Sequence, residues 1–415
     1  MSKNVILLSI DALRPDRLSC NGYEGIQTPN IDEIAKRGVV YDNCITASCL
    51  TPVSMASVMT GKYPSKHGLR DPFGHIDAVT IAELFKNKGY ATAGFTGINF
   101  LSRRCGFDKG FDVWDEPTAE TSWFQKQYQV GEETDAKEMT TQWGNWWPPK
   151  MMDFIIENKD KPFFTWGHYF EVHYHAEKWM LKQGMLEEGV NAENAYYDAK
   201  IKYLDEHVIG PINAYLKTSR LWDNTMIVFM SDHGETMMQN PGLALADMGE
   251  DYPKHRTMSQ DDLRSTLIMT GGIRQQGHRE SKLVRTIDVV PTILDVCFGE
   301  GIWDADGQSL YYRNFLSQPA YSEEMFEKRG AGSLQAIQNN RFKFVRNNTT
   351  GDEQFFDLQE NPGEDNNLIG DAKYQRNVEI CRTELDKRKG ANSGSKMKPE
   401  DEQVVLDKLK ELGYI

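Results

Sequence analysis

Three separated stretches of the chain carry polar side chains that suit hydrolysis at a metal ion. Asp11 follows one apolar run, and Asp232 and His233 follow another. The third stretch, Thr51–Lys62, offers several hydroxyl groups, of which Thr51 is the first. Two carboxylates and an imidazole suit a divalent metal, which can ionise a nearby hydroxyl into a nucleophile. Each stretch alone is a weak signal, because an aspartate after a strand is also a common helix cap.

The pattern around these residues predicts an α/β sandwich. Four short apolar runs read as buried strands: Val5–Ile10, Pro162–Trp166, Thr225–Met230 and Ser265–Thr270. Between them lie segments with helical spacing, which are Ile31–Arg37, Thr80–Lys88 and Asn194–Thr218. Ligand sites gather at the carboxyl ends of parallel strands, so we expect Asp11, Thr51 and Asp232 to meet in one crevice.

A second pattern begins after the Gly- and Asp-rich stretch Gly299–Gly307. Short segments at Ser333–Ile337, Arg341–Val345 and Glu353–Leu358 predict antiparallel strands, and a charged helix is expected from about residue Pro399. We therefore expect a catalytic domain over residues 1–305 and a smaller α+β domain over residues 306–415. A length of 415 residues agrees with this division.

Composition limits the partners and the compartment. The formal net charge of -14 argues against nucleic acid as a partner. This charge is compatible with a local basic pocket that binds a small anionic ester. Apolar runs stay well short of the roughly 18 residues that span a bilayer, so no membrane partner is expected. The six cysteines are scattered without CxxC pairs, which predicts reduced thiols and a cytoplasmic protein. The sequence leaves open whether the chain forms a homo-oligomer.

The segment Thr121–Met180 is rich in tryptophan. Its aromatic side chains are interpreted first as packing for an insertion against the sheet, because aromatics dominate core burial. A lid that stacks on substrate is the alternative.

A series of motifs along the chain resembles the sulfatase family of the alkaline phosphatase superfamily, almost from end to end and in the family's order. The segments that carry the resemblance are Asn4–Gly22, Gly61–Gly68, Ser231–Glu235, Arg285–Asp295 and Phe355–Leu368. The first and third are similar to the family's two metal motifs, and the second to its Gly-[Lys/Arg]-Tyr-Pro-x-x-His-Gly motif. The resemblance implies a large α/β/α sandwich around a mixed sheet of about ten strands, with a short antiparallel sheet in a smaller C-terminal α+β domain.

The chain departs from the family at the nucleophile. Thr51 stands where family sulfatases have the cysteine that becomes formylglycine, and Met55 stands at the motif's arginine. Cys49 lies two residues too early and is interpreted as a buried thiol. Threonine cannot become formylglycine but can attack phosphorus as a metal-bound alkoxide, as the resemblance to other superfamily members implies. The family's sulfate-gripping lysine also has no counterpart in Thr96–Asn99.

The resemblance assigns the metal ligands to Asp11, Thr51, Asp232 and His233. Because Ala12 replaces a second aspartate and His233 replaces an asparagine, zinc or manganese is expected rather than calcium. One metal site is firmly expected. A second site would involve His255 with His173 or His175.

Further catalytic roles fall on four residues. The stretch Gly167–His175 resembles the family's F-x-D-P-H-x-P segment, and its His173 is expected to contact the transferred group or protonate the leaving oxygen. His255 is the next candidate to bind the substrate oxyanion. Lys254 and Arg14 are expected to neutralise developing negative charge, with surface ion pairs as the alternative.

The leading hypothesis is a metal-dependent hydrolase of phosphate or phosphonate esters, mono- or diesters, that uses Thr51 as nucleophile. A sulfate ester hydrolase that works without formylglycine is the first alternative. A transferase that hands the phosphoryl group to an alcohol and a non-catalytic binding protein are the others. Preferred turnover of aryl sulfates, product formation that rises with added alcohol, and failure to bind metal would distinguish them.

Overall fold

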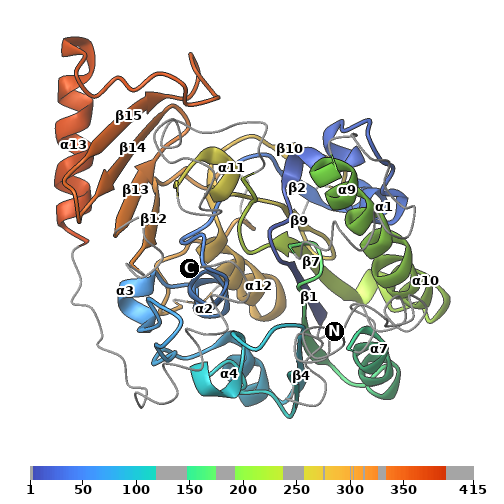
Figure 1. Ribbon diagram of the computed structural model, residues 1–415. Helices are drawn as coiled ribbons and strands as arrows, with labels where there is room; N and C mark the ends of the chain where they lie inside the picture. Colours follow the sequence, from blue (N-terminus) through green and yellow to red (C-terminus); the bar gives the residue numbers. More distant parts are fainter. Residues whose placement is uncertain are drawn as a thin grey trace, which may run out of the picture.

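The computed structural model describes residues 3–117, 147–173, 192–236, 257–273, 276–299, 301, 303–311, 314–325 and 333–388. Within them, a mixed sheet of eight strands lies between two layers of helices, and a separate four-stranded sheet lies at one end of the molecule (Figure 1). This is the predicted α/β/α sandwich with a short antiparallel C-terminal sheet.

The large sheet has the strand order β10-β2-β9-β7-β1-β6-β4-β5. Its bounds are β1 Asn4–Ile10, β2 Val39–Tyr41, β4 Ala91–Thr96, β5 Val113–Asp115, β6 Phe163–Tyr169, β7 Thr225–Ser231, β9 Leu267–Met269 and β10 His278–Glu280. β1 lies between β6 and β7 and is parallel to both, whereas β9 is antiparallel to β7 and to β2. Three of the predicted apolar runs, Val5–Ile10, Pro162–Trp166 and Thr225–Met230, therefore lie in β1, β6 and β7 in the middle of the sheet.

The expectation of about ten strands was wrong for the described residues, whose main sheet has eight. The apolar run Ser265–Thr270 divides at Thr266, whose backbone nitrogen and oxygen both bond to Ser231. Before that point, β8 Arg264–Ser265 pairs with β3 Cys44–Ile45, which also pairs with β11 Val284–Arg285. These two-residue strands form a separate small sheet, so they do not extend the large one.

Helices cover both faces of the large sheet because its central strands are apolar on both sides. Val5 and Leu7 of β1 pack with α2 Thr51–Thr60, α4 Ile81–Asn87 and α12 Val289–Phe298. Ile6 and Leu8 pack with α1 Pro29–Arg37, α7 Pro148–Glu157, α9 Ala192–Leu204 and α10 Gly210–Thr218. A π-helical turn, Asp205–Ile209, joins α9 to α10, which agrees with one long helical segment predicted there. The short helices α3 Pro64–His67 and α11 Gln260–Leu263 lie beside these layers.

The four-stranded sheet supports the segment that leads into α2. It consists of β12 Ala320–Glu324, β13 Leu334–Gln338, β14 Phe342–Asn347 and β15 Glu353–Asp357, all antiparallel. One face packs against α13 Gln375–Asp386, and the other face contacts Ile45 and Cys49. A buried ion pair of 2.7 Å between Arg70 and Glu323 also links the loop after α3 to β12. The division at residues 305 and 306 stays a prediction, and the expected helix from Pro399 lies outside the described residues.

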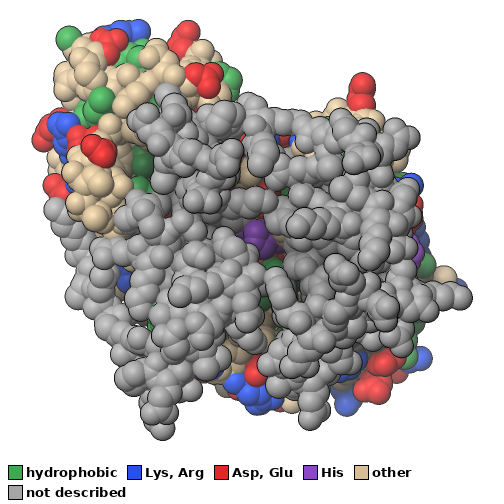
Figure 2. Space-filling model, viewed as in Figure 1, with side chains coloured by type: hydrophobic (Ala, Val, Ile, Leu, Met, Phe, Trp, Pro, Cys, Tyr) green, Lys and Arg blue, Asp and Glu red, His purple; other side chains and the backbone are tan. Residues whose placement is uncertain are grey.

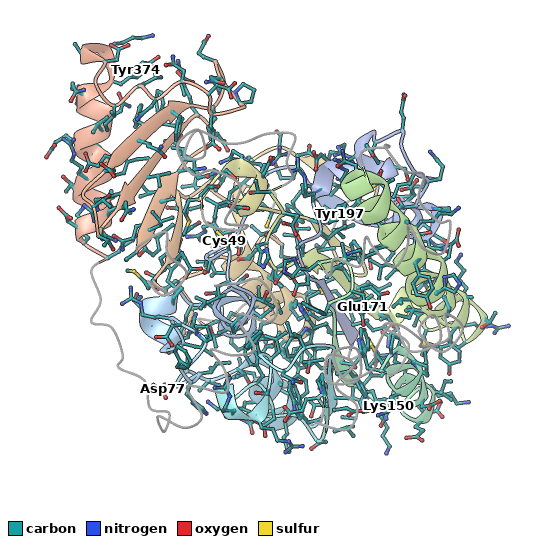
Figure 3. All side chains as sticks on the ribbon, in the orientation of Figure 1. Cys49, Asp77, Lys150, Glu171, Tyr197 and Tyr374 are labelled. Atoms are coloured by element: carbon teal, nitrogen blue, oxygen red, sulfur yellow. The ribbon has the colours of Figure 1, made fainter. Side chains whose placement is uncertain are left out.

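Several further sequence predictions concern cysteine, tryptophan and the membrane. All six cysteines are free, and Cys49 is fully buried as a thiol beside Met258 (Figure 3). Trp147 and Trp166 are fully buried, so packing accounts for these two members of the Trp-rich segment. Trp123, Trp143, Trp146 and Trp179 lie outside the described residues. No described helix combines the length and the apolar character needed to cross a bilayer.

Candidate active site

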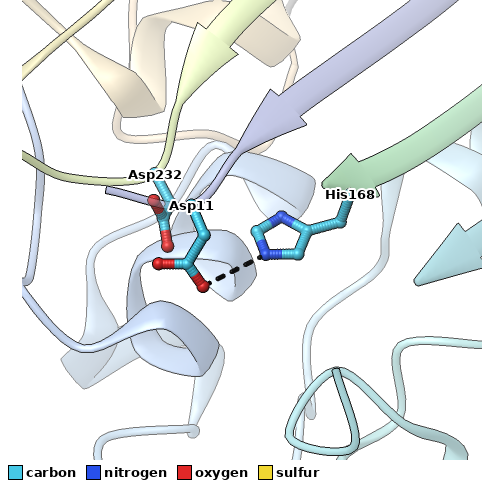
Figure 4. A group of neighbouring side chains, drawn as sticks. All are labelled: Asp11, His168 and Asp232. Carbon is cyan, nitrogen blue, oxygen red and sulfur yellow. Dashed lines mark ion pairs between the residues drawn. The ribbon is translucent and has the colours of Figure 1, made fainter. Parts of the chain in front are cut away.

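The ends of β1, β6 and β7 bring three titratable side chains together. Alternate residues of these strands pack toward α2, α4 and α12, and the same alternation puts Asp11, His168 and Asp232 on that face. One ligand atom from each residue lies within 4.8 Å of the others, and all three residues are fully buried. Figure 4 shows the two carboxylates and the imidazole converging from the three strand ends.

This group fits a divalent metal ion. Asp11 Oδ1, Asp232 Oδ2 and His168 Nε2 are buried and have no hydrogen-bond partner among the described residues. Buried charged groups are expensive unless they are paired or bind a metal. The unpaired atoms therefore identify a place where a cation would satisfy three otherwise unsatisfied groups at once.

Thr51 and His233 border the same group. Thr51 Oγ1 lies 3.4 Å from Asp11 Oδ2 and 3.2 Å from His233 Nε2. His233 Nε2 is also 3.3 Å from Asp232 Oδ2. When the His233 ring is neutral, Nδ1–H donates to the Gly234 carbonyl at 2.8 Å, so Nε2 faces the site with its lone pair. The structure thus brings together the four predicted ligands, Asp11, Thr51, Asp232 and His233, and adds His168.

The pKa shifts of the two aspartates describe an excess of buried negative charge. Burial raises the pKa of the Asp232 carboxyl, and the neighbouring charge of Asp11 raises it further. Burial also acts to raise the pKa of Asp11, but contact with His168 and the nearby imidazoles of His173 and His233 outweighs it and lowers that pKa. Positive charge therefore stabilises the ionised form of both carboxylates, which a divalent cation would also do.

Backbone geometry fixes Asp232 in place. Its Oδ1 accepts hydrogen bonds from Ala12 N at 3.0 Å and from His233 N at 2.8 Å. Ala12 has a φ of 56°, a left-handed conformation that costs of order 1–3 kcal/mol for a non-glycine residue. At Gly234, a Cβ atom would lie 1.9 Å from the Asp261 carbonyl oxygen, so this position requires glycine. The Ser-Asp-His-Gly motif is thus a consequence of close packing as well as of chemistry.

Thr51 is the first residue of α2 and is 1% exposed. A helix N-terminus presents free backbone N–H groups and a partial positive charge, both of which favour an anion. One turn later, Ser54 donates its hydroxyl to the Asp232 carbonyl oxygen at 2.7 Å and contacts Thr46 at 2.9 Å. Helix α2 is therefore tied directly to the loop that carries Asp232.

His173 lies next to this group in a pair with Glu235. Its Nδ1 is 3.0 Å from Glu235 Oε2, and its ring centroid is 6.5 Å from that of His233. Glu235 is 1% exposed and His173 is 6% exposed. With Nδ1–H directed to a carboxylate, the remaining nitrogen of His173 suits proton transfer to or from a bound group, the predicted role.

The cationic candidates stand apart from the site or outside the described residues. Arg14 donates to Asp16 at 2.9 and 2.8 Å and to the Glu235 carbonyl oxygen at 2.9 Å, and it pairs with Asp261 at 3.1 Å. Its charge is therefore already balanced by two carboxylates, and its contact with Glu235 supports the loop that holds His173. Lys254 and His255 lie outside the described residues.

Sequence reasoning missed two residues of the site. His168 lies inside the stretch Gly167–His175, but it has no role among the predicted site residues. Its spacing of two residues from Trp166 on β6 is a signal that it shares a face of the sheet with Trp166. Glu235 was quoted in a motif and received no role. Its signal was weaker, because only the fold shows that Glu235 meets His173.

Glu171 provides a test of local electrostatics. The Oε2 atom of this half-buried residue is shielded from solvent and has no hydrogen-bond partner among the described residues (Figure 3). Burial raises the pKa of Glu171 from 4.5 to about 7. The folded state binds this proton more tightly than the unfolded state. Ionisation of Glu171 therefore lowers the free energy of unfolding as pH rises from 4.5 to 7, and the full penalty is present above pH 7.

We expect Glu171→Gln to raise the free energy of unfolding by up to about 3 kcal/mol at pH 8 and to leave it unchanged near pH 4. Denaturant unfolding at both pH values measures the difference. Equal stability of the variant and the wild type at pH 8 would contradict the raised pKa.

A buried group of acids and imidazoles with a neighbouring hydroxyl, at the carboxyl edge of a mixed α/β/α sheet, is the arrangement expected of a metal-dependent hydrolase. The family model for sulfatases matches residues 3–299, and the chain belongs to the sulfatase family. It is thus a sulfatase-family hydrolase that acts on ester bonds, as the motifs predicted.

Individual relatives span nearly the whole chain. An arylsulfatase of Clostridium perfringens is 25% identical over 96% of this chain and 97% of its own. The multifunctional alkaline phosphatase superfamily protein PehA of Trinickia caryophylli is 23% identical over 90% and 92% of the two chains. The crystal structure of a phosphonate monoester hydrolase of Agrobacterium radiobacter has the same fold, with a TM-score of 0.73, 19% identity and coverage of 93% and 95%.

Proposed function

We propose that this protein hydrolyses anionic esters at a divalent metal site, with Thr51 as the nucleophile and sulfate esters as the first class of substrate. The observation that carries the proposal is the position of Thr51 Oγ1, buried at the start of α2 and 3.2 Å from His233 Nε2. A hydroxyl in this position is held beside the group of acids and imidazoles that would bind the anionic half of the ester.

The reaction is a two-step displacement. Thr51 Oγ attacks the sulfur or phosphorus atom, the bond to the ester oxygen breaks, and the alcohol leaves with a proton. Water then attacks the same atom and releases Thr51 and the inorganic anion. Asp11 Oδ2 lies within reach of the Thr51 proton, and His173, oriented by Glu235, supplies the proton to the leaving oxygen.

Asp11, His168, Asp232 and His233 would hold the metal. When bound, a divalent ion supplies positive charge that lowers the pKa of a neighbouring hydroxyl and balances the charge of the ester. Two imidazoles beside two carboxylates favour zinc or manganese over calcium. His255 is the proposed oxyanion contact, and Lys254 would neutralise developing negative charge. A second metal site would use His255 with His173 or His175.

The comparisons favour sulfate esters over the phosphate or phosphonate esters that the sequence placed first. One relative is the arylsulfatase of Clostridium perfringens described above. Another is an ulvan-active sulfatase of Formosa agariphila, which is 25% identical over 96% of this chain and 83% of its own. Both match nearly all of this chain and are named for sulfate esters, which supports sulfate esters as the first class of substrate.

Phosphate and phosphonate esters are the second candidate substrates. The observation that favours them is Thr51 itself, because threonine cannot become formylglycine and its hydroxyl can attack phosphorus. The similarity to PehA supports this alternative. Transfer of the group to an alcohol in place of water would make the protein a transferase with the same first step.

The proposed partner is a small anionic ester, and nucleic acid is not proposed. Figure 2 shows Lys and Arg side chains interspersed with Asp and Glu side chains along the visible edges of the described surface. Continuous basic surface is the electrostatic requirement for nucleic-acid binding. The mixed charge of the described edges and the net charge of -14 both argue against it.

Initial rates on matched nitrophenyl esters test the proposal. The sulfate, phosphate monoester, phosphate diester and phenylphosphonate would be compared with zinc or manganese and again with a chelator. Faster turnover of the sulfate that is lost with the chelator supports the first candidate, and faster turnover of a phosphoryl ester replaces it by the second. No turnover of any of the four esters with either metal would contradict ester hydrolysis at this site.

A further inference from the structure

A buried chain of three side chains, Trp166, Ser9 and His168, ends at the group formed by Asp11, His168 and Asp232. Trp166 Nε1 is 2.8 Å from Ser9 Oγ, and Ser9 Oγ is 2.9 Å from His168 Nδ1. All three residues are 0% exposed. Ser9 and His168 are direct neighbours in the register of β1 and β6, so the sheet itself holds this contact.

The hydrogen-bonding capacity of Ser9 allows two arrangements. A serine hydroxyl has one hydrogen and two lone pairs, and the Trp166 N–H is a donor only, so it occupies one lone pair. The hydroxyl hydrogen then has two acceptors in reach, which are His168 Nδ1 at 2.9 Å and the Gly167 carbonyl oxygen at 3.5 Å. The choice between them decides which nitrogen of a neutral His168 ring carries the proton.

In the first arrangement, Ser9 donates to His168 Nδ1, and the ring proton is on Nε2. That nitrogen lies 3.5 Å from Asp11 Oδ2, so an N–H faces a carboxylate. In the second arrangement, His168 Nδ1–H donates to Ser9, and Ser9 donates to Gly167. Nε2 then turns a lone pair toward the carboxylate of Asp11, which is repulsive unless a cation lies between them.

We propose that Ser9 is a positioning residue that switches His168 into the tautomer able to bind a metal ion. Rotation of the Ser9 hydroxyl from His168 to Gly167 lets Ser9 accept a hydrogen bond from His168 Nδ1–H. Water that enters with the metal ion takes the proton from Nε2 and returns one to Nδ1, so the ring keeps its charge and Nε2 becomes free as a ligand. The inference rests on the proposed metal-dependent function and goes beyond it, because it assigns a role to a residue that touches neither substrate nor metal.

Removing the hydroxyl should weaken metal binding specifically. In Ser9→Ala, the metal-binding tautomer leaves the Nδ1–H of His168 buried without a partner, and orphaned buried N–H groups are rare because they are costly. Partners of a ligating histidine typically contribute 10- to 100-fold to metal affinity. We expect the dissociation constant for zinc or manganese to rise by about 10- to 100-fold.

A matched control exists in α2. Ser57 Oγ lies 2.9 Å from His67 Nε2, which is another fully buried serine–histidine pair outside the cation site. Ser57→Ala therefore removes a contact of the same kind and length without touching His168. Ser9→Thr keeps the hydroxyl and is the rescue variant.

The experiment is calorimetric titration of the metal-free full chain with zinc or manganese. The inference predicts weaker binding in Ser9→Ala, and wild-type affinity in Ser57→Ala and Ser9→Thr. Nitrogen NMR of the His168 ring in the wild type, assigned by comparison with His168→Gln, should show the protonated nitrogen move from Nε2 to Nδ1 on metal binding. This second readout needs no folded Ser9 variant.

Two failures are distinguishable. If the wild type binds metal and Ser9→Ala binds it equally tightly, or if the His168 ring proton stays on Nε2 in the bound state, the inference is overturned and the proposed function stands. If the wild type binds neither metal, the proposed function is overturned together with the inference.

Discussion

Replacing Thr51 by alanine is expected to lower kcat by at least about 1,000-fold, because removal of a nucleophile leaves only binding and charge stabilisation. The substitution removes the hydroxyl that lies 3.4 Å from Asp11 Oδ2 and 3.2 Å from His233 Nε2. Neither the charge nor the backbone of the site changes. Initial rates with the preferred nitrophenyl ester, at saturating metal, measure the loss.

Two variants control for effects on folding. Thr60→Ala makes the same chemical change on the same helix, where the Thr60 hydroxyl bonds to the Ala56 carbonyl at 2.7 Å, and it should leave kcat unchanged. Thr51→Ser keeps a hydroxyl at the start of α2 and should keep kcat within about tenfold of the wild type. Turnover by metal-loaded Thr51→Ala at the rate of Thr60→Ala would show that Thr51 is not the nucleophile.

Replacing Asp232 by asparagine is expected to have opposite effects on stability without and with metal. The asparagine oxygen can keep the two bonds from Ala12 N and His233 N, while its amide takes the place of the unpaired Oδ2 atom. Without metal, loss of this buried charge beside Asp11 should raise the free energy of unfolding by about 1–3 kcal/mol. With metal, loss of a direct ligand should weaken binding by more than about 100-fold, which exceeds the contribution of an indirect partner.

Denaturant unfolding with and without zinc or manganese, together with calorimetry, separates the two effects. Asp288→Asn is the matched control, because Asp288 is another fully buried aspartate whose charge is paired with Arg285 at 2.7 Å. The Asp288→Asn variant should have a lower free energy of unfolding than the wild type both with and without metal, because the substitution breaks a buried ion pair. Its metal affinity should be unchanged. Lower stability of metal-free Asp232→Asn, or wild-type metal affinity in that variant, would contradict a cation site at Asp11, His168 and Asp232.

Local sequence patterns predicted the framework of this site well. The apolar runs that end in Asp11 and Asp232 are central strands, because continuous apolar sequence suits a strand that is covered on both faces. The family resemblance put Thr51 at the position of the nucleophile, and the structure shows that this residue begins α2.

What the sequence could not predict depends on contacts between distant segments. His168 is 157 residues from Asp11 in the chain, and only the pairing of β1 with β6 brings the two side chains to 3.5 Å. Glu235 and His173 meet because two separate loops converge. The expected number of strands in the large sheet came from the family resemblance. It exceeds the eight that the described residues form, because pairings such as β3 with β8 build a separate small sheet.

The most direct test of the central claim is a single-turnover reaction with an ester labelled in its sulfate or phosphate group, quenched with acid at several times and followed by peptide mapping. The account predicts transient label on the peptide that contains Thr51, and none at that peptide in Thr51→Ala. Label on a different residue, or complete product formation with unlabelled protein at every sampled time, would contradict it.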